Sequence, residues 1–329
     1  MTRRTPALFL AVSLCACAPP QASGAARRAP AGAPALSFPL ACSIGAGCEV
    51  QHYVDRDAGP GVRDYHGGRR TYEGHNGIDL RIADMAAERA GVNVLAAAPG
   101  RVARLRDGIP DVSIRAAAAP DVDGRECGNG VVIDHGGGWE TQYCHLQQGS
   151  LRVRVGETVT AGEPIARVGL SGDTEFAHMH LSVRHDGQVV DPFAPAAGAG
   201  PLWDARAMKA LTYKAGAVLN AGFASGPTSM QAVEDGGVPK PDANSPALVA
   251  YARAIELEGG DEVELILKGP DGAVLARDRK PLDRDKAQHL LFVGRKRPPT
   301  GWTPGTYRAD YTVYRGGRAA LAKSFEIRF

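Results

Sequence analysis

Apolar and polar residues alternate along three segments near the C-terminus, and this period of two constrains the fold more than any other feature. The alternation covers residues 262–268, 307–313 and 325–329, with Ile266 as an apolar residue at a polar position. Successive side chains of a strand point to opposite faces, so each segment is typical of a strand with one buried face. We therefore expect residues 246–329 to form a small antiparallel β-sandwich, immunoglobulin-like in style.

Glycine and proline support a mostly β fold for the rest of the chain. The 329 residues include 41 Gly and 23 Pro, which favour turns and short strands over helical bundles. A chain of this length is long enough for two domains. The 38 Lys and Arg nearly balance the 36 Asp and Glu, so no strongly basic surface is expected and nucleic acid is not an expected partner.

The N-terminus has the pattern of an export signal. Arg3 and Arg4 precede an apolar run over residues 7–14, which is too short to span a membrane as a mature helix. The run leads to Cys17, as in a bacterial lipoprotein signal, although Cys15 departs from the usual residue two places earlier. We predict a signal over residues 1–16, lipid on Cys17 and a flexible tether over 17–35; the alternative is secretion with cleavage after a small residue such as Ala18.

Either interpretation places the mature chain in the cell envelope or beyond it. The expected location is lipid-anchored and facing the periplasm, with secretion as the alternative, and the only expected membrane contact is the lipid on Cys17. Four more cysteines follow, and an even set in an exported chain indicates disulfides. Sequential pairing, Cys42 with Cys48 and Cys127 with Cys144, is the simplest of the three connectivities.

The middle of the chain divides by its composition. Short β-type segments occur at 131–133, 151–155 and 181–183, and a polar, alanine-rich surface loop is expected over 107–124. Residues 201–245 are rich in breakers and are predicted to be a linker region. The folded domain before that linker is expected over residues 36–200.

Candidate metal ligands occur in three short motifs. His75 and Asp79 are four residues apart, and His178 and His180 would share one face of a strand. His145 lies in a third segment of the same kind, residues 142–146. A single histidine is more often a surface or hydrogen-bonded residue than a ligand. The combination of the three motifs in this order is much more specific.

These motifs make residues 73–195 similar to the LytM/lysostaphin-type zinc metallopeptidases of family M23. The segment 75–79 resembles the family's HxxxD, 178–180 its HxH, and 143–146 its strand ending in YxHL. The glycine-rich segments 128–133 and 156–165 and the ending 190–192 also resemble family positions. The resemblance implies an antiparallel β-sheet peptidase domain.

The resemblance also implies roles for five residues. It implies His75, Asp79 and His180 as ligands of one Zn²⁺ per chain, and His145 and His178 as catalytic histidines that do not bind the metal. Two imidazoles and one carboxylate leave a position on zinc open for water, as in catalytic rather than structural sites. The oligomeric state is not predicted.

The implied function is hydrolysis of peptide cross-links in bacterial peptidoglycan, whose cross-link peptides are the expected partners. The bond would be either D-Ala to diaminopimelate, favoured by the lipoprotein signal, or a glycyl bond. The alternative is a non-catalytic LytM-type activator or scaffold of another cell-wall hydrolase. Such modules generally lack one or more metal ligands, and all five positions are filled here.

The remaining candidates have plainer interpretations. His135 is expected to be a structural turn residue. Tyr72 could line a substrate groove, but an ordinary half-buried aromatic residue is the favoured interpretation. Alternation along a strand would turn Cys144 away from His145, so a bridge to Cys127 would brace that strand from behind. The histidines without a partner motif are expected at the surface: His52, His66, His185 and His289.

Overall fold

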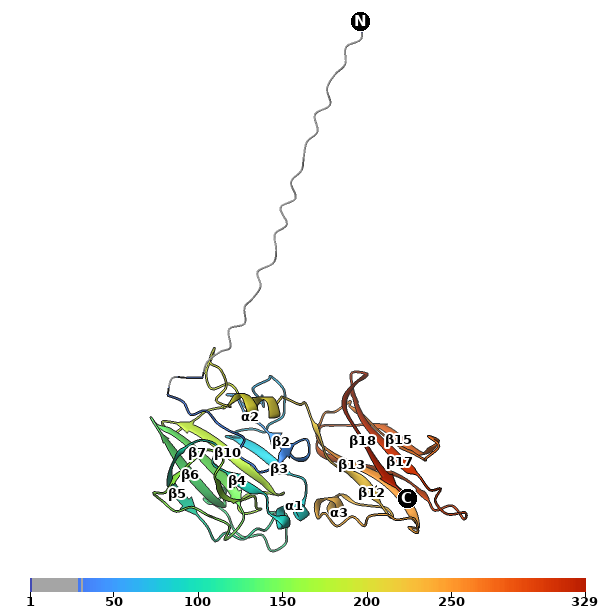
Figure 1. The fold of residues 1–329 in the computed structure, drawn as a ribbon. Helices are drawn as coiled ribbons and strands as arrows, with labels where there is room; N and C mark the ends of the chain where they lie inside the picture. The colour runs from blue at the N-terminus through green and yellow to red at the C-terminus, as the bar shows by residue number, and fades with distance from the viewer. Residues whose placement is uncertain (2–28, 31) are drawn as a thin grey trace.

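The computed structural model describes residues 1, 29–30 and 32–329, and the regular secondary structure in them is mainly β-strand. The expected signal over 1–16, the lipid site at Cys17 and most of the tether lie outside the described residues. Figure 1 shows the strands in two groups that lie side by side. Within the part of the chain that is described, no helix is long and apolar enough to cross a membrane.

The first group is built on one nine-stranded sheet. Its order is β1-β2-β3-β10-β7-β6-β5-β8, with β11 added to β10. The strands are β1 (Ser43–Ile44), β2 (Gly47–His52), β3 (Ile78–Ile82), β5 (Gly100–Arg106), β6 (Asn129–Gly136), β7 (Trp139–Leu146), β8 (Thr158–Val159), β10 (His178–His185) and β11 (Gln188–Val189). Helix α1 (Met85–Ala90) follows β3, and β4 (Asn93–Leu95) pairs with β9 (Pro164–Arg167) in a small second sheet.

Strand β10 is the centre of this sheet because it is antiparallel to both β3 and β7. Its apolar residues Met179, Leu181 and Val183 are buried in a core that extends along the chain from Leu36 to Leu211. The other face of β10 therefore presents its histidines, which is the alternation expected of a strand with one face in the core.

The second group is a sandwich of two antiparallel sheets. One sheet has the order β12-β13-β16, from β12 (Ala217–Ala224), β13 (Ala247–Leu257) and β16 (Lys286–Lys296). The other has the order β15-β14-β17-β18, from β15 (Val274–Pro281), β14 (Glu262–Lys268), β17 (Thr306–Arg315) and β18 (Arg318–Arg328). The alternation that predicted strands there is confirmed, since Val263, Leu265 and Leu267 are fully buried in the shared core.

Two local predictions were wrong. Residues 201–245 are not a continuous loop, because they hold α2 (Ala205–Ala210), β12 and α3 (Met230–Glu234). Strand β12 pairs along most of β13, so its weak alternation is compensated by a buried partner strand. Residues 151–155, which were expected to be a short β-type segment, form no strand. Their backbone still makes a hydrogen bond, from the Arg152 N–H to the Ile165 carbonyl oxygen.

Buried polar contacts join the two groups of strands. Arg81 of β3 pairs with Glu234 of α3 at 2.7 Å, and Arg253 of β13 pairs with the same carboxylate. Both arginine side chains are almost completely buried, so their charges are balanced by the Glu234 carboxylate rather than by water. This attaches the sandwich to β3, the strand that carries Asp79.

Candidate metal centre

His75, Asp79 and His180 meet at one end of the β3–β10 pair. The Asp79 Oδ1 atom lies 2.9 Å from His180 Nδ1 and 3.2 Å from His75 Nε2, and the two imidazole nitrogens are 3.2 Å apart. All three residues are buried, with exposed fractions of 3%, 3% and 9% for His75, Asp79 and His180. The predicted ligand set is therefore a single cluster in space.

The strand register explains why these residues meet. Asp79 of β3 lies directly opposite His180 of β10, so their side chains share one face of the sheet. His75 reaches the same point from the turn before β3. Gly77 makes that turn possible, since a Cβ there would lie 2.4 Å from His180 Nε2 and 2.6 Å from the Leu181 carbonyl oxygen.

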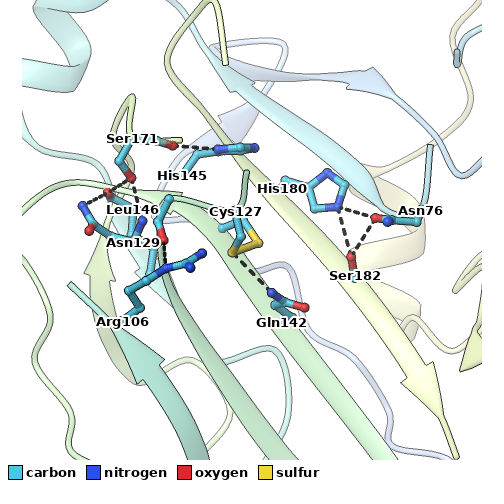
Figure 2. Close-up of a disulfide and its surroundings, with 12 residues drawn as sticks. Asn76, Arg106, Cys127, Asn129, Gln142, His145, Leu146, Ser171, His180 and Ser182 are labelled. Atoms are coloured by element: carbon cyan, nitrogen blue, oxygen red, sulfur yellow. Dashed lines mark hydrogen bonds between the residues drawn. A yellow bond between two sulfur atoms is a disulfide. The ribbon is translucent and has the colours of Figure 1, made fainter. Parts of the chain in front are cut away.

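Hydrogen bonds fix the orientation of both imidazoles. His75 Nδ1 lies 2.6 Å from the Tyr53 carbonyl oxygen, which only accepts, so Nδ1–H donates and Nε2 carries a lone pair. His180 Nε2 lies 3.1 Å from Asn76 Oδ1 and 3.0 Å from Ser182 Oγ, as Figure 2 shows. That nitrogen donates to the Asn76 amide oxygen, which leaves the Nδ1 lone pair directed at Asp79.

The cluster consequently has acceptors on all three sides. The lone pairs of His75 Nε2 and His180 Nδ1 and a carboxylate oxygen of Asp79 face one another, and no proton donor is left between them. Converging buried acceptors are unfavourable without a cation. A two-histidine, one-carboxylate set with outer hydrogen bonds on both imidazoles fits zinc, so these residues are suited to hold it.

His145 and His178 stand beside the cluster. Their ring centroids are 4.6 Å apart, and His145 lies 6.1 Å from the His180 ring. His145 Nδ1–H donates to the Ser171 carbonyl oxygen at 2.8 Å (Figure 2). His178 Nδ1–H donates to the Phe176 carbonyl oxygen at 2.9 Å. Each ring therefore has an unprotonated Nε2 when it is neutral.

Burial and neighbouring charges shift the pKa values of these groups. Burial would raise the pKa of Asp79, but the surrounding imidazoles outweigh it and hold that pKa well below its usual value. Burial lowers the pKa of His180, despite the opposing effect of Asp79. Burial, reinforced by the charges of His178 and His180, holds the pKa of His145 well below its usual value. His145 is thus neutral and able to accept a proton.

His52 was expected at the surface, and that prediction was wrong. Its Nδ1 lies 2.9 Å from Asp79 Oδ2, and its Nε2 lies 3.4 Å from Glu256 Oε1 of the sandwich. Burial lowers the pKa of His52, but Asp79 and Glu256 outweigh it and raise the pKa to about 9. No local motif marks His52, because its partners are 27 and 204 residues away in the sequence.

Two hollows flank the cluster. One, of about 530 Å³, is lined by His178 and Arg115 and, from the sandwich, by Lys286 and Gln288. The other, of about 290 Å³, is lined by His180, Cys144 and Arg184 on the opposite side. Tyr72 lines both and is 51% exposed, so it is a groove residue rather than the half-buried aromatic that was expected.

Both predicted disulfides are present, but the position expected for the second was wrong. Cys42 bonds to Cys48 and Cys127 bonds to Cys144. Cys144 lies directly opposite His180 on β10, so it shares the groove face and does not brace the strand from behind. Alternation fails because His145 has a positive φ of 59°, which turns both residues toward the groove.

The other histidines lie away from the cluster. His135 contacts the Pro99 carbonyl oxygen and Thr141 Oγ1, in agreement with a structural role. His66 stacks on Tyr213 and His185 on Trp139. His289 is partly buried on β16.

Comparison with known proteins agrees with this arrangement. The model of peptidase family M23 matches residues 73–192, which include all three cluster residues, His145 and His178. Over these residues the chain is similar to the peptidases of family M23. This confirms the family resemblance inferred from the motifs.

Three curated relatives each match part of the chain. The chain is 26% identical over 129 residues to cell division protein DipM of Caulobacter vibrioides, covering 39% of this chain and 17% of that protein. It is 42% identical over 62 residues to murein hydrolase activator EnvC of Escherichia coli, covering 19% of this chain and 14% of that protein. It is 31% identical over 118 residues to an uncharacterised metalloprotease of Haemophilus influenzae, covering 36% of this chain and 20% of that protein.

The chain therefore spans no more than a fifth of the length of these relatives. Among solved structures, the catalytic domain of the M23 protein EnpA of Enterococcus faecalis aligns with a TM-score of 0.33 at 20% identity, over 47% of this chain and 95% of that one. The relatives include one named a metalloprotease and one named a hydrolase activator.

Proposed function

We propose that the protein is a zinc metalloendopeptidase that hydrolyses peptide cross-links of bacterial peptidoglycan. The observation that carries the proposal is the convergence of His75, Asp79 and His180 with two further imidazoles, His145 and His178, at a groove. An activator has no need of a complete buried ligand set. The expected location, an exported chain in the cell envelope with a lipid on Cys17, forms part of the same proposal.

The ligands have the orientation that metal binding requires. His75 Nε2, Asp79 Oδ1 and His180 Nδ1 would hold one zinc ion, with Tyr53 and Asn76 fixing the imidazoles from behind. A zinc ion held there would polarise the scissile carbonyl and lower the pKa of a water molecule.

The neighbouring imidazoles would manage the protons of peptide hydrolysis. The neutral His145 Nε2 can accept a proton from the attacking water and return it to the leaving amine as the C–N bond breaks. His178, 4.6 Å from His145, can donate a hydrogen bond to the oxyanion when its Nε2 is protonated. The two hollows would hold the peptide on either side of the bond.

The test is incubation of the purified, zinc-loaded protein with cross-linked muropeptides and identification of the products by mass spectrometry. We expect cleavage that a chelator abolishes and added zinc restores. The masses of the products identify the bond that is cut. The matched control is His145→Ala, which keeps the ligand set and should lose turnover. Absence of cleavage by folded, zinc-loaded protein would refute the proposal.

The identity to EnvC favours a second candidate function, activation of another cell-wall hydrolase. The same preparation tests it when it is mixed with a separate amidase. Stimulation of the amidase by a protein that itself cuts no muropeptide would establish that function. Stimulation that persists in His180→Ala would further separate it from zinc chemistry.

A further inference from the structure

The sandwich reaches the metal centre through a chain of three side chains. Glu256 Oε1 of β13 lies 3.4 Å from His52 Nε2, and His52 Nδ1 lies 2.9 Å from Asp79 Oδ2. The side chains of His52, Glu256 and Asp79 are only 15%, 14% and 4% exposed, so these contacts are largely shielded from solvent. Glu256 of the sandwich is thus connected to Asp79, an expected ligand, through His52.

The two oxygens of Asp79 have different partners. Oδ1 faces His75 and His180, with His178 Nε2 at 3.4 Å, whereas Oδ2 contacts His52. A carboxylate rotates about its last bond unless both oxygens are engaged, and rotation would exchange or misdirect the ligand oxygen. His52 therefore holds the rotamer that presents Oδ1 to the cluster.

The backbone at Glu256 supports a role beyond packing. Glu256 has a φ of 55°, a left-handed conformation that is unfavourable for a residue with a Cβ. The pairing of β13 with β16 runs from Ile255 opposite Gln288 to Leu257 opposite Lys286 and leaves Glu256 without a partner. Its side chain turns instead to the first sheet, where Gln51 Nε2 also donates to it at 2.5 Å. Backbone strain of this kind is often found where a side chain must be aimed.

We propose that Glu256 is a positioning residue of the metal centre, which holds Asp79 in its ligating orientation by holding His52. The inference rests on the proposed zinc site. It assigns the sandwich a part in metal binding, in addition to its contribution of groove residues.

The experiment measures zinc affinity of the full chain by competition with a chromophoric chelator. His52→Ala should weaken zinc binding by about 10–100-fold, the usual effect of removing an outer partner of a ligand. Glu256→Ala should weaken it in the same direction by a smaller factor. Because both act through one route, the double variant should bind no more weakly than His52→Ala alone.

A spectroscopic readout separates positioning from general stability. Cobalt(II) in place of zinc absorbs visible light according to its ligand geometry, so His52→Ala and Glu256→Ala should both shift that absorption spectrum. The matched control is Glu258→Ala. Glu258 is two residues beyond Glu256 and pairs with Arg315, which also belongs to the sandwich. It should leave zinc affinity and the cobalt spectrum unchanged.

A second substitution keeps the test decisive if Glu256→Ala does not fold. Glu256→Gln retains size and an acceptor oxygen but loses the charge, and it should show the same shift in smaller degree. Unchanged zinc affinity and cobalt spectrum in folded Glu256 variants, or losses that add in the double variant, would overturn the inference. If the unmodified protein binds no zinc, the proposed function itself fails, which is a distinguishable result.

Discussion

The Cys127–Cys144 disulfide should stabilise the protein more than Cys42–Cys48 and should also affect turnover. The bonds close loops with sequence separations of 17 and 6 residues. Loop-closure entropy then assigns them about 3 and about 2 kcal/mol of stability at 25 °C. The perturbation is replacement of each cysteine pair by alanines, one pair at a time.

The position of the second disulfide adds a consequence that loop length does not capture. The backbone N–H of His145 donates to the Cys127 carbonyl oxygen at 2.8 Å, so the bond helps to hold the segment that carries the expected proton acceptor. Cys42 and Cys48 lie at the edge of the sheet, on and beside β2, and make no such contact. Loss of turnover should therefore accompany only the Cys127/Cys144 replacement.

The assay is scanning calorimetry of metal-free proteins, followed by turnover of the zinc-loaded proteins well below their melting temperatures. A loss of about 3 kcal/mol should lower Tm by about 6–12 °C, and a loss of about 2 kcal/mol by about 4–8 °C. Equal decreases in Tm for the two pairs, or normal turnover without Cys127 and Cys144, would refute this reasoning.

Three further predictions follow from the site and its surroundings. His180→Ala should lose zinc whereas His145→Ala should keep it; metal analysis decides, and full occupancy in His180→Ala would contradict the ligand set. Gly77→Ala places a Cβ 2.4 Å from His180 Nε2 and should weaken zinc binding, as chelator competition would measure. Burial raises the pKa of Asp191 to about 6, so its contribution to stability is full below pH 4 and is lost as the pH rises through 6. The Asp191→Asn substitution should therefore increase the free energy of unfolding by up to about 3 kcal/mol at pH 8 and leave it unchanged at pH 4, as urea titrations would measure. An equal increase at both pH values would contradict the argument.

Local patterns in the sequence were sufficient for the strands of the sandwich and for the candidate ligands. Residues 262–268 and 307–313 alternate strictly enough that burial of one face follows from the geometry of a strand. His178 and His180 were placed on one strand face by the same period. The motifs with His75 and Asp79 carried the family resemblance, which comparison with known proteins confirms.

Contacts between distant segments lay beyond the sequence patterns. Strand β12 was expected to be part of a linker, because its apolar and polar residues alternate only weakly. The strand forms because its pairing with β13 supplies the stabilisation that its own pattern lacks. Cys144 was expected behind its strand, because the positive φ of His145 is not marked by residue type. In both cases the deciding energy comes from a neighbour that is remote along the chain.

The sequence by itself determined which residue types are available for metal chemistry and the spacing that aligns two of them on one strand. Only the tertiary structure decided that His52 belongs beside Asp79 and that Glu256 approaches it from the sandwich. The physical reason is that a strand's period is local and is written in consecutive residues. The packing of one unit against another depends on the shape and charge of whole surfaces, which no short window of sequence contains.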